Sequence, residues 1–220
     1  MDYAALKVSL QLALFTLVLL LPLGLYFGRL MAFKHFFGKS VFQGLILLPL
    51  VLPPTVLGYY LLTALGSQAP LGRLLQDATG LRLVFNFSGL LLASVIFNIP
   101  FMLQPIQRAF ESIPKQLREA AFVSGLSLWQ TFLRVELPLA WPGIVSAIAL
   151  TFVHTLGEFG VVMMLGGNIP GETRTLAIAI YDEVQAFNLA GAQQMSAALL
   201  LFSLLAVTLS FYASSRLVRR

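Results

Sequence analysis

The chain has 220 residues, of which 58% are hydrophobic and 10% are charged. Soluble domains carry roughly 25% charged residues, so this composition excludes an ordinary water-soluble protein and predicts one surrounded by membrane lipid. The net charge is +5, and a basic excess in so apolar a chain orients loops at a membrane rather than binding nucleic acid. With no cysteine and two histidines, the chain is not expected to hold a disulfide, a thiolate or histidine-rich metal site, or a cysteine nucleophile.

Five uncharged windows are long enough for a membrane span, which needs about 20 apolar residues. The sequence therefore predicts an all-α polytopic membrane protein with five spans in a single domain, residues 1–220. The first window is longer than the apolar part of a signal peptide and is expected to be a retained helix. A sixth window, 159–171, is short, rich in glycine and a poor independent span. The five spans are expected at about 8–30, 41–65, 84–107, 137–160 and 190–214.

Positive charge alternates between the segments that join these spans. Basic residues gather on the cytoplasmic side of membrane proteins, so the more basic set of segments is expected to be cytoplasmic. This places the N-terminus on the outer side and the C-terminus in the cytoplasm. The cytoplasmic set holds Arg29, Lys34, Lys39, Arg108, Lys115, Arg118, Arg134, Arg216, Arg219 and Arg220, and the outer set holds Lys7, Arg73, Arg82 and Arg174.

The second expected span contains Pro49, Pro53 and Pro54. A proline inside a helix removes a backbone donor and clashes with the preceding turn, so this span is predicted to be kinked or broken near its middle. Two interpretations remain open, because the kink is either accommodated by helix packing or shapes the wall of a pore.

A carboxylate, Glu158, lies at the end of the fourth expected span. Within a span such a charge costs on the order of 2.5–3.5 kcal/mol, so it should face a protein interior, a water-filled cavity or a partner. This favours a role in a transport pathway or a gate, and the alternative is a solvated charge at the outer interface. His154 shares a helix face with Glu158, but the spacing differs from the H-E-x-x-H pattern of zinc proteases, so no metal site is predicted.

The segment 108–136 is the longest charged stretch and belongs to the cytoplasmic set. Ser112 as a cap and Pro114 in the first turn predict the start of a short helix, which Gly125 can end.

A second short helix is predicted over Leu128–Val135, because Ser127 and Gln130 match a capping box. The two helices would form a compact knob beneath the bilayer. Ala120 and Ala121 would permit the close approach of a partner, and Leu117 and Phe122 would offer apolar anchors.

At these residues the chain resembles a known family. Glu119-Ala120-Ala121, followed by Gly125 and later by Pro138, resembles the E-A-A-x-x-x-G loop of the permeases of binding-protein-dependent ABC importers. The stretches 48–55, 157–160 and 168–175 resemble the molybdate-transporter permeases, and this similarity runs along essentially the whole chain.

The resemblance implies a type I importer permease in a bacterial inner membrane, with a periplasmic N-terminus. It implies a homodimer above two cytoplasmic ABC ATPase subunits, fed by a periplasmic molybdate-binding protein. The chain would then be a transport subunit and no enzyme, without a cofactor, and would work by alternating access. The coupling helix that sits in a cleft of the ATPase would include Glu119, Ala120, Ala121 and Gly125, with Pro138 where the chain enters the membrane.

Molybdate is a tetrahedral dianion, yet the uncharged windows of the expected spans contain no Lys or Arg. Few polar groups remain for its route, which suggests weak binding there and selection by the soluble binding protein. The turn-rich segment 168–175 would dock that protein or form the outer gate, and a plain exposed turn is the alternative. The pathway or gate candidates are Thr55, Ser146, Thr151, Thr155 and Glu158, and the docking candidates are Gly171, Glu172 and Arg174.

Three alternatives stay open at this point. A stand-alone channel or secondary carrier would need no cytoplasmic docking helix and usually shows internal repeats or more ionisable residues in its spans. An intramembrane enzyme would use His154 and Glu158 without any ATPase. Within the transporter class, tungstate and sulfate compete with molybdate as cargo, because these oxyanions differ little in shape.

Overall fold

The computed structural model describes residues 1–80 and 82–218, and the regular elements in this part of the chain are all helices. Four helices among the described residues are long and apolar enough to cross a membrane, and a fifth span is formed if one bent pair of helices counts as one. The predicted all-α membrane class is therefore confirmed. These elements are α1 (Tyr3–Phe33), the bent pair α2 (Lys39–Val51) and α3 (Pro54–Leu65), α5 (Phe87–Glu111), α8 (Leu137–Gly157) with the turns that lead into it, and α11 (Leu189–Val218).

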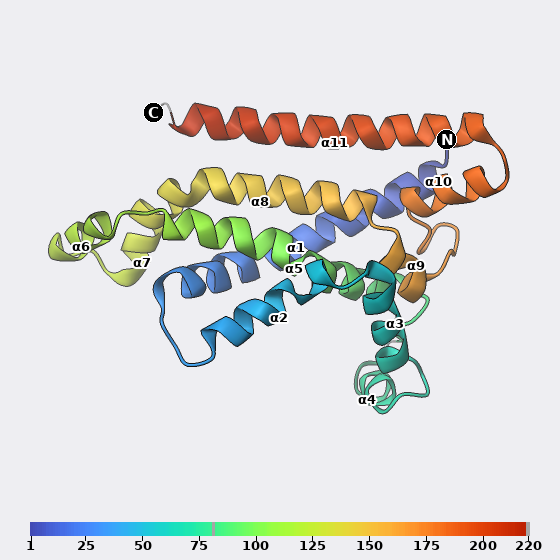
Figure 1. Cartoon of the computed structure of the whole chain (residues 1–220), viewed down its shortest axis with the longest axis horizontal. Coiled ribbons are helices and arrows are strands. Elements are labelled where there is room, and N and C mark those ends of the chain that lie inside the picture. Colours follow the sequence, from blue (N-terminus) through green and yellow to red (C-terminus); the bar gives the residue numbers. More distant parts are fainter. Residues whose placement is uncertain (81, 219–220) are drawn as a thin grey trace.

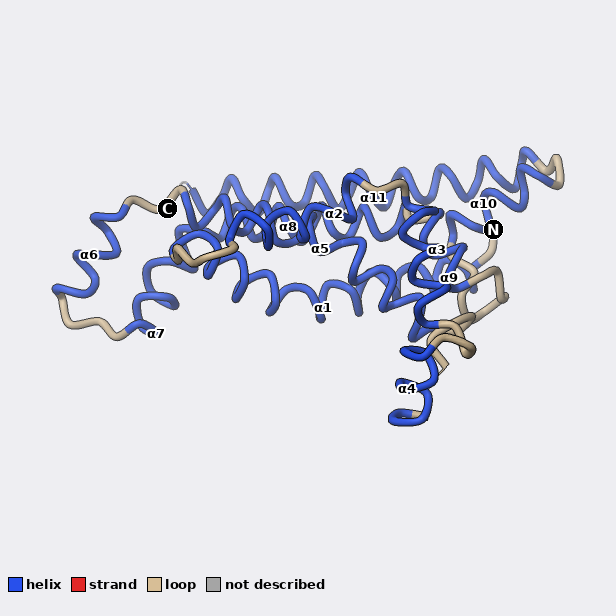
Figure 2. The backbone as a smooth tube through the Cα atoms, turned by 60° about the horizontal axis from the view of Figure 1, so that its bottom comes forward, coloured by secondary structure: helices blue, strands red, loops and turns tan. Residues whose placement is uncertain are grey.

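The long helices form a bundle that carries short helices at both ends. Helix α5 packs against both α1 and α8, and α11 runs along α8 (Figure 1). One end of the bundle carries α6 (Lys115–Val123) and α7 (Leu128–Thr131), and the opposite end carries α4 (Pro70–Thr79), α9 (Gly160–Gly166) and α10 (Leu176–Gln185). Figure 2 shows the same separation from a second direction, with α6 and α7 far from α4 along the bundle.

Glycines allow α1 to approach α5 closely. A Cβ atom at Gly24 would lie 2.7 Å from Cγ of Met102, and one at Gly28 would lie 2.8 Å from Cγ2 of Ile106. The G-x-x-x-G spacing therefore serves the close packing of two spans, as it does in other membrane helices.

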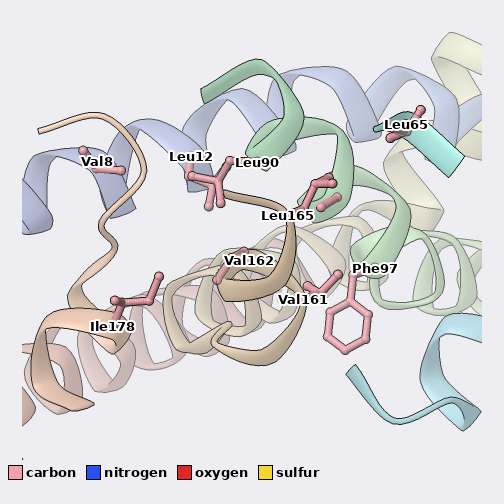
Figure 3. Close-up of a cluster of buried hydrophobic side chains, with 10 residues drawn as sticks. Val8, Leu12, Leu65, Leu90, Phe97, Val161, Val162, Leu165 and Ile178 are labelled. Carbon is pink, nitrogen blue, oxygen red and sulfur yellow. The ribbon is translucent and has the colours of Figure 1, made fainter. Parts of the chain in front are cut away.

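An apolar cluster near the α9 and α10 end joins helices that are distant in sequence. Figure 3 shows Leu12 of α1 next to Leu90 of α5, with Leu165 and Val162 of α9 nearby, and Ile178 of α10 belongs to the same cluster. All five of these side chains are fully buried. The cluster fixes the short helix α9 against the long helices, which explains how a window too short for a span is held at this end.

The predicted break in the second span is confirmed. Helices α2 and α3 meet at an angle of 107°. Leu52 and Pro53, which join them, have extended backbone angles, with ψ of 140° and 135°. Each of these residues precedes a proline, and the ring of a following proline disfavours the helical conformation. Pro54 then occupies the first turn of α3, where its missing N–H costs no hydrogen bond.

The helices differ from the expected spans at their ends. Helix α1 is longer at both ends than the expected 8–30, and α5 extends to Glu111 rather than to residue 107. Helix α4, which follows the bent pair, was not expected from the sequence. Of the basic residues that set the expected orientation, Arg219 and Arg220 lie outside the described residues.

Candidate functional site

Helix α6 forms the exposed tip of the segment that joins α5 to α8. It begins after Pro114, which caps it without a side-chain hydrogen bond. The expectation that Ser112 caps this helix is wrong, because its hydroxyl donates to the carbonyl of Ala109 at 2.8 Å and closes the end of α5. At the other end Gly125 has a φ of +80°, a left-handed conformation that favours glycine, so it ends the helix as predicted.

The capping box at the start of α7 is present as predicted. The amide of Gln130 donates to the Ser127 hydroxyl at 3.3 Å, and the side-chain oxygen of Gln130 accepts from the amide of Ser127 at 2.9 Å. The expectation of a separate helix over Leu128–Val135 is wrong, because α7 continues through a π-helical turn, η1 (Phe132–Glu136), directly into α8. The amide of Leu137 bonds to the carbonyl of Phe132, five residues back, and this wide turn precedes Pro138 in the first turn of α8.

Three of the predicted coupling residues are exposed at the tip, one is buried there, and one lies at the start of α8. Glu119, Ala120 and Gly125 are exposed, and Glu119 pairs with Lys115 at 3.2 Å. Ala121 is 5% exposed and packs inside its own chain, so its side chain, unlike those of its neighbours, is turned away from the surface. Pro138 is exposed but lies at the base of α8, not on the tip. Among the predicted apolar anchors, Leu117 and Phe122 are 45% and 40% exposed.

A buried carboxylate connects this tip to the bundle. Glu136, the last residue of η1, is fully buried and accepts hydrogen bonds from two arginines. Nε and Nη2 of Arg29, on α1, lie 2.5 and 3.2 Å from its two oxygens. Nε of Arg118, on α6, lies 2.8 Å from one of them. The Arg118 guanidinium also lies 3.5 Å from the ring centroid of Phe33, the last residue of α1.

A second polar cluster lies inside the bundle around Glu158. The side-chain amide of Asn98, on α5, donates a hydrogen bond to this carboxylate. The same amide donates a second hydrogen bond, of 2.9 Å, to the backbone carbonyl of Ser94. The Ser94 hydroxyl accepts from Thr16 of α1 at 3.0 Å. Nδ1 of His154 lies 3.0 Å from Oδ1 of Asn98 and 3.7 Å from the Glu158 carboxylate. The cluster therefore links α1, α5 and α8 through hydrogen bonds.

Glu158 is buried rather than solvated. The residue is 4% exposed, so the alternative of a solvated charge at an interface is wrong. One of its oxygens, Oε2, has no hydrogen-bond partner among the described residues. A cavity of about 340 Å³ lies beside it, lined in part by Pro54, His154 and Gly160. The carboxylate thus sits where the break between α2 and α3 approaches the end of α8.

The threonines predicted for a pathway fall into two groups. Thr151 is fully buried with a hydroxyl that has no partner among the described residues, and Thr155 is buried and donates to the carbonyl of Thr151 at 2.8 Å. Thr55 is exposed at the start of α3 and lies next to Gly160. The part of the chain that the structure describes contains no group of three or more His, Cys, Asp or Glu side chains that could hold a metal ion.

The predicted docking residues also differ in their exposure. Gly171, with a φ of +78°, and Glu172 are exposed in the turn that precedes α10. Arg174 pairs with Asp182 of α10 at 2.6 Å and with Asp2 at 3.9 Å. Arg174 therefore ties the turn to the bundle and to the start of the chain, whereas Glu172 is available to a partner.

Sequence reasoning assigned no role in a site to Glu136, Asn98, Arg29 or Arg118, and it used the two arginines only to set the orientation. A local signal existed for two of them. Asn98 is an amide within an otherwise apolar stretch, and Glu136 is an acid directly before the apolar window that begins at Leu137. Their partners are far away in sequence, up to 107 positions in the case of Arg29, so no local pattern pairs them.

Comparisons with known proteins identify the family of the chain. Residues 12–220 match the family described as the binding-protein-dependent transport system inner membrane component. The chain is 45% identical to the molybdenum transport system permease protein ModB of Azotobacter vinelandii over 98% of this chain and 95% of that protein. It is 37% identical to ModB of Haemophilus influenzae over the whole of this chain and 95% of that protein.

The fold matches those of solved ABC transporters. One similar chain comes from the crystal structure of the bacterial alginate ABC transporter in complex with an alginate pentasaccharide-bound periplasmic protein. The match covers 97% of this chain and 78% of that chain, with a TM-score of 0.79 and 19% sequence identity. A second similar chain comes from the MetNI methionine transporter in an inward-facing conformation. The match covers 98% of this chain and 94% of that chain, with a TM-score of 0.70 and 16% sequence identity. The resemblance seen in the sequence is thus confirmed, and the chain belongs to the family of binding-protein-dependent transport system inner membrane components, as a permease of the ABC importer type.

Proposed function

We propose that this permease carries molybdate into the cytoplasm as the membrane-spanning subunit of an ATP-driven importer. The observation that carries the proposal is the 45% identity with a molybdenum transport permease over nearly the whole of both chains. ATP hydrolysis belongs to separate ATPase subunits, and the permease provides the route through the membrane.

The proposed assembly is a homodimer of permeases with two cytoplasmic ATPase subunits and a periplasmic molybdate-binding protein. Large apolar surfaces support a need for further partners and for lipid. In the most apolar stretch of α11, only 6% of the residues are buried within the chain. Side chains such as Leu200 and Leu204 are more than half exposed. In water such a surface would be unfavourable, but against lipid or a second permease it is stable.

The proposed orientation places α6 in the cytoplasm and the N-terminus in the periplasm. Two observations support it. The N-terminus and the α6 tip lie at opposite ends of the bundle, and α11 ends at the same end of the bundle as the tip (Figure 1). The exposed turn with Gly171 and Glu172 precedes α10, which lies at the N-terminal end, so it would face the binding protein.

In the proposed mechanism the ATPase pair moves α6, and the bundle alternates between openings to the two sides. The exposed residues Glu119, Ala120 and Gly125 would contact the ATPase, and Pro138 would lie where the chain returns to the membrane. The cluster of Asn98 and Glu158 would hold the route closed near the break between α2 and α3, because its hydrogen bonds must rearrange for α5 and α8 to separate. Thr55, Thr151 and Thr155 would contribute the polar groups beside this gate.

Sulfate is the second candidate for the cargo. A protein of Chlorella vulgaris described as a probable sulfate transport system permease is 33% identical over 80% of this chain and 65% of its own length. Uptake of labelled molybdate, and in parallel of labelled sulfate, into proteoliposomes that contain the whole complex separates the candidates, with the unlabelled oxyanions, tungstate included, as competitors. The proposal predicts that molybdate is imported and that an excess of sulfate competes weakly. Strong uptake of sulfate with none of molybdate would contradict it.

A further inference from the structure

The coupling helix α6 is attached to the bundle at few points. Within α6 only Ala121 is buried, and the residues on either side of the helix, Pro114 and Gly125, are exposed. A helix held so loosely by apolar contacts would tilt on its own when a partner pulls on it. Some other contact must therefore carry its movement to the long helices.

Arg118 supplies this contact from the middle of α6. Its Nε donates to Glu136 at 2.8 Å, and its guanidinium carbon lies 3.5 Å from the ring centroid of Phe33. The Arg118 side chain is 21% exposed, so most of it lies against the bundle. One arginine of α6 thus reaches both the start of α8 and the end of α1.

Glu136 connects these two elements to each other. Its carboxylate accepts hydrogen bonds from both Arg118 and Arg29, and each of its two oxygens has at least one donor. Removal of either partner leaves a buried carboxylate poorly paired, which is strongly unfavourable. Guanidinium groups bind a carboxylate in a few fixed geometries, whereas apolar side chains can slide past one another. The network therefore fixes the direction of α6 relative to α1 and α8.

From this geometry we propose that Glu136 is a positioning residue that makes α6, the end of α1 and the start of α8 move as one body during transport. The inference rests on the proposed coupling role of α6. It adds that the movement of the ATPase reaches the first and fourth spans through two arginines and one carboxylate, and not through the backbone turns alone.

Distances between spin labels test this proposal without altering the network. The chain contains no cysteine, so Gln116→Cys on α6 and Tyr26→Cys on α1 can be labelled specifically. Labelled permease is diluted with an excess of unlabelled permease, so that most of the complexes that carry a label carry one labelled protomer. The distance between the two labels is expected to be the same in the nucleotide-free and ATP-bound complexes. A shift between these states would overturn the proposal.

A single label at Gln116→Cys in both protomers provides the internal reference. The proposed function predicts that this distance between protomers changes with the nucleotide. A constant distance here would contradict the proposed function, whereas a change within one protomer would contradict only the role of Glu136. The two failures are therefore distinguishable.

Glu136→Gln tests the consequence for transport. This variant keeps the size of the side chain and removes its charge, and Glu111→Gln at a more exposed ion pair with Arg108 is the matched control. We expect Glu136→Gln to raise the ATP hydrolysed per oxyanion imported several-fold and to make the Gln116–Tyr26 distance depend on the nucleotide, while Glu111→Gln changes neither. An unchanged ratio in assembled Glu136→Gln complexes would overturn the proposal.

Discussion

The side-chain amide of Asn98 donates a hydrogen bond to the carboxylate of Glu158, 60 positions further along the chain. Both residues are buried, and the bond joins the middle of α5 to the residue that directly follows α8. A polar contact of this kind inside a membrane protein is costly unless its partners are satisfied, so it marks a place where α5 and α8 must stay together in the conformation observed.

Asn98→Leu is therefore expected to destabilise the permease. Leucine is similar in size but leaves the Glu158 carboxylate without its amide donor, at a cost of about 1–3 kcal/mol or more. Thermal unfolding of the detergent-solubilised protein measures this loss. Gln185→Ala, which removes an exposed bond to Tyr181, is the control and should leave the unfolding temperature nearly unchanged. Equal stability of Asn98→Leu and the parent protein would contradict the structural role of the bond.

Gly28→Val tests the close packing of α1 on α5. A Cβ atom at this position would lie 2.8 Å from Ile106 and 3.2 Å from the backbone nitrogen of Gln107, so the helices must separate. We expect a loss of about 1–3 kcal/mol in the free energy of unfolding. Gly44→Val in α2 is the control, because a Cβ atom there would meet no neighbouring element within 4 Å. The packing argument fails if the two variants unfold at the same temperature.

Gly125→Asp is expected to leave membrane insertion intact and to reduce the amount of ATPase that copurifies with the permease. The added side chain at the exposed end of α6 would hinder the proposed contact. Gly80→Asp is a matched control, because Gly80 has a φ of +72° against +80° at Gly125, and both positions have open space for a side chain. The backbone strain is thus similar in both variants, and only Gly125→Asp should lose the ATPase. Normal copurification with Gly125→Asp would count against the assigned docking site.

Glu172→Ala and Arg174→Ala should have different effects, although both residues were predicted to dock the binding protein. Glu172 is exposed, so its loss is expected to weaken the binding of the periplasmic protein with no change in thermal stability. Arg174 pairs with Asp182 and Asp2, so Arg174→Ala is expected to lower the stability by about 1 kcal/mol or less. Thermal unfolding and a pull-down with the binding protein separate the two effects, and identical behaviour of the two variants would refute this assignment.

Local patterns in the sequence were sufficient to predict much of the fold. The uncharged windows located the long helices, and the prolines at positions 53 and 54 located the break between α2 and α3. The Ser127 and Gln130 pair predicted its capping box, and Gly125 predicted the end of α6. Each of these features depends on residues within one or two helical turns, so no knowledge of the tertiary structure was needed.

Features that depend on distant residues could not be predicted in this way. Glu136 is buried at the end of the π-helical turn before Pro138, and its pairing with Arg29 spans 107 positions. Ala121 was expected to face a partner because it is small, yet the same small size lets it pack inside its own chain. Arg174 was expected in a docking turn because it follows Pro170 and Gly171, but Asp182 and Asp2 reach it from other parts of the chain.

The central claim is that transport by this permease is driven by a separate ATPase that acts through α6. The most direct test compares the accumulation of labelled molybdate in proteoliposomes that contain the permease alone with accumulation in proteoliposomes that contain the whole complex. We predict accumulation against a gradient only when the ATPase subunits, the binding protein and ATP are all present. Accumulation by the permease alone, or by the complex without ATP, would contradict the claim.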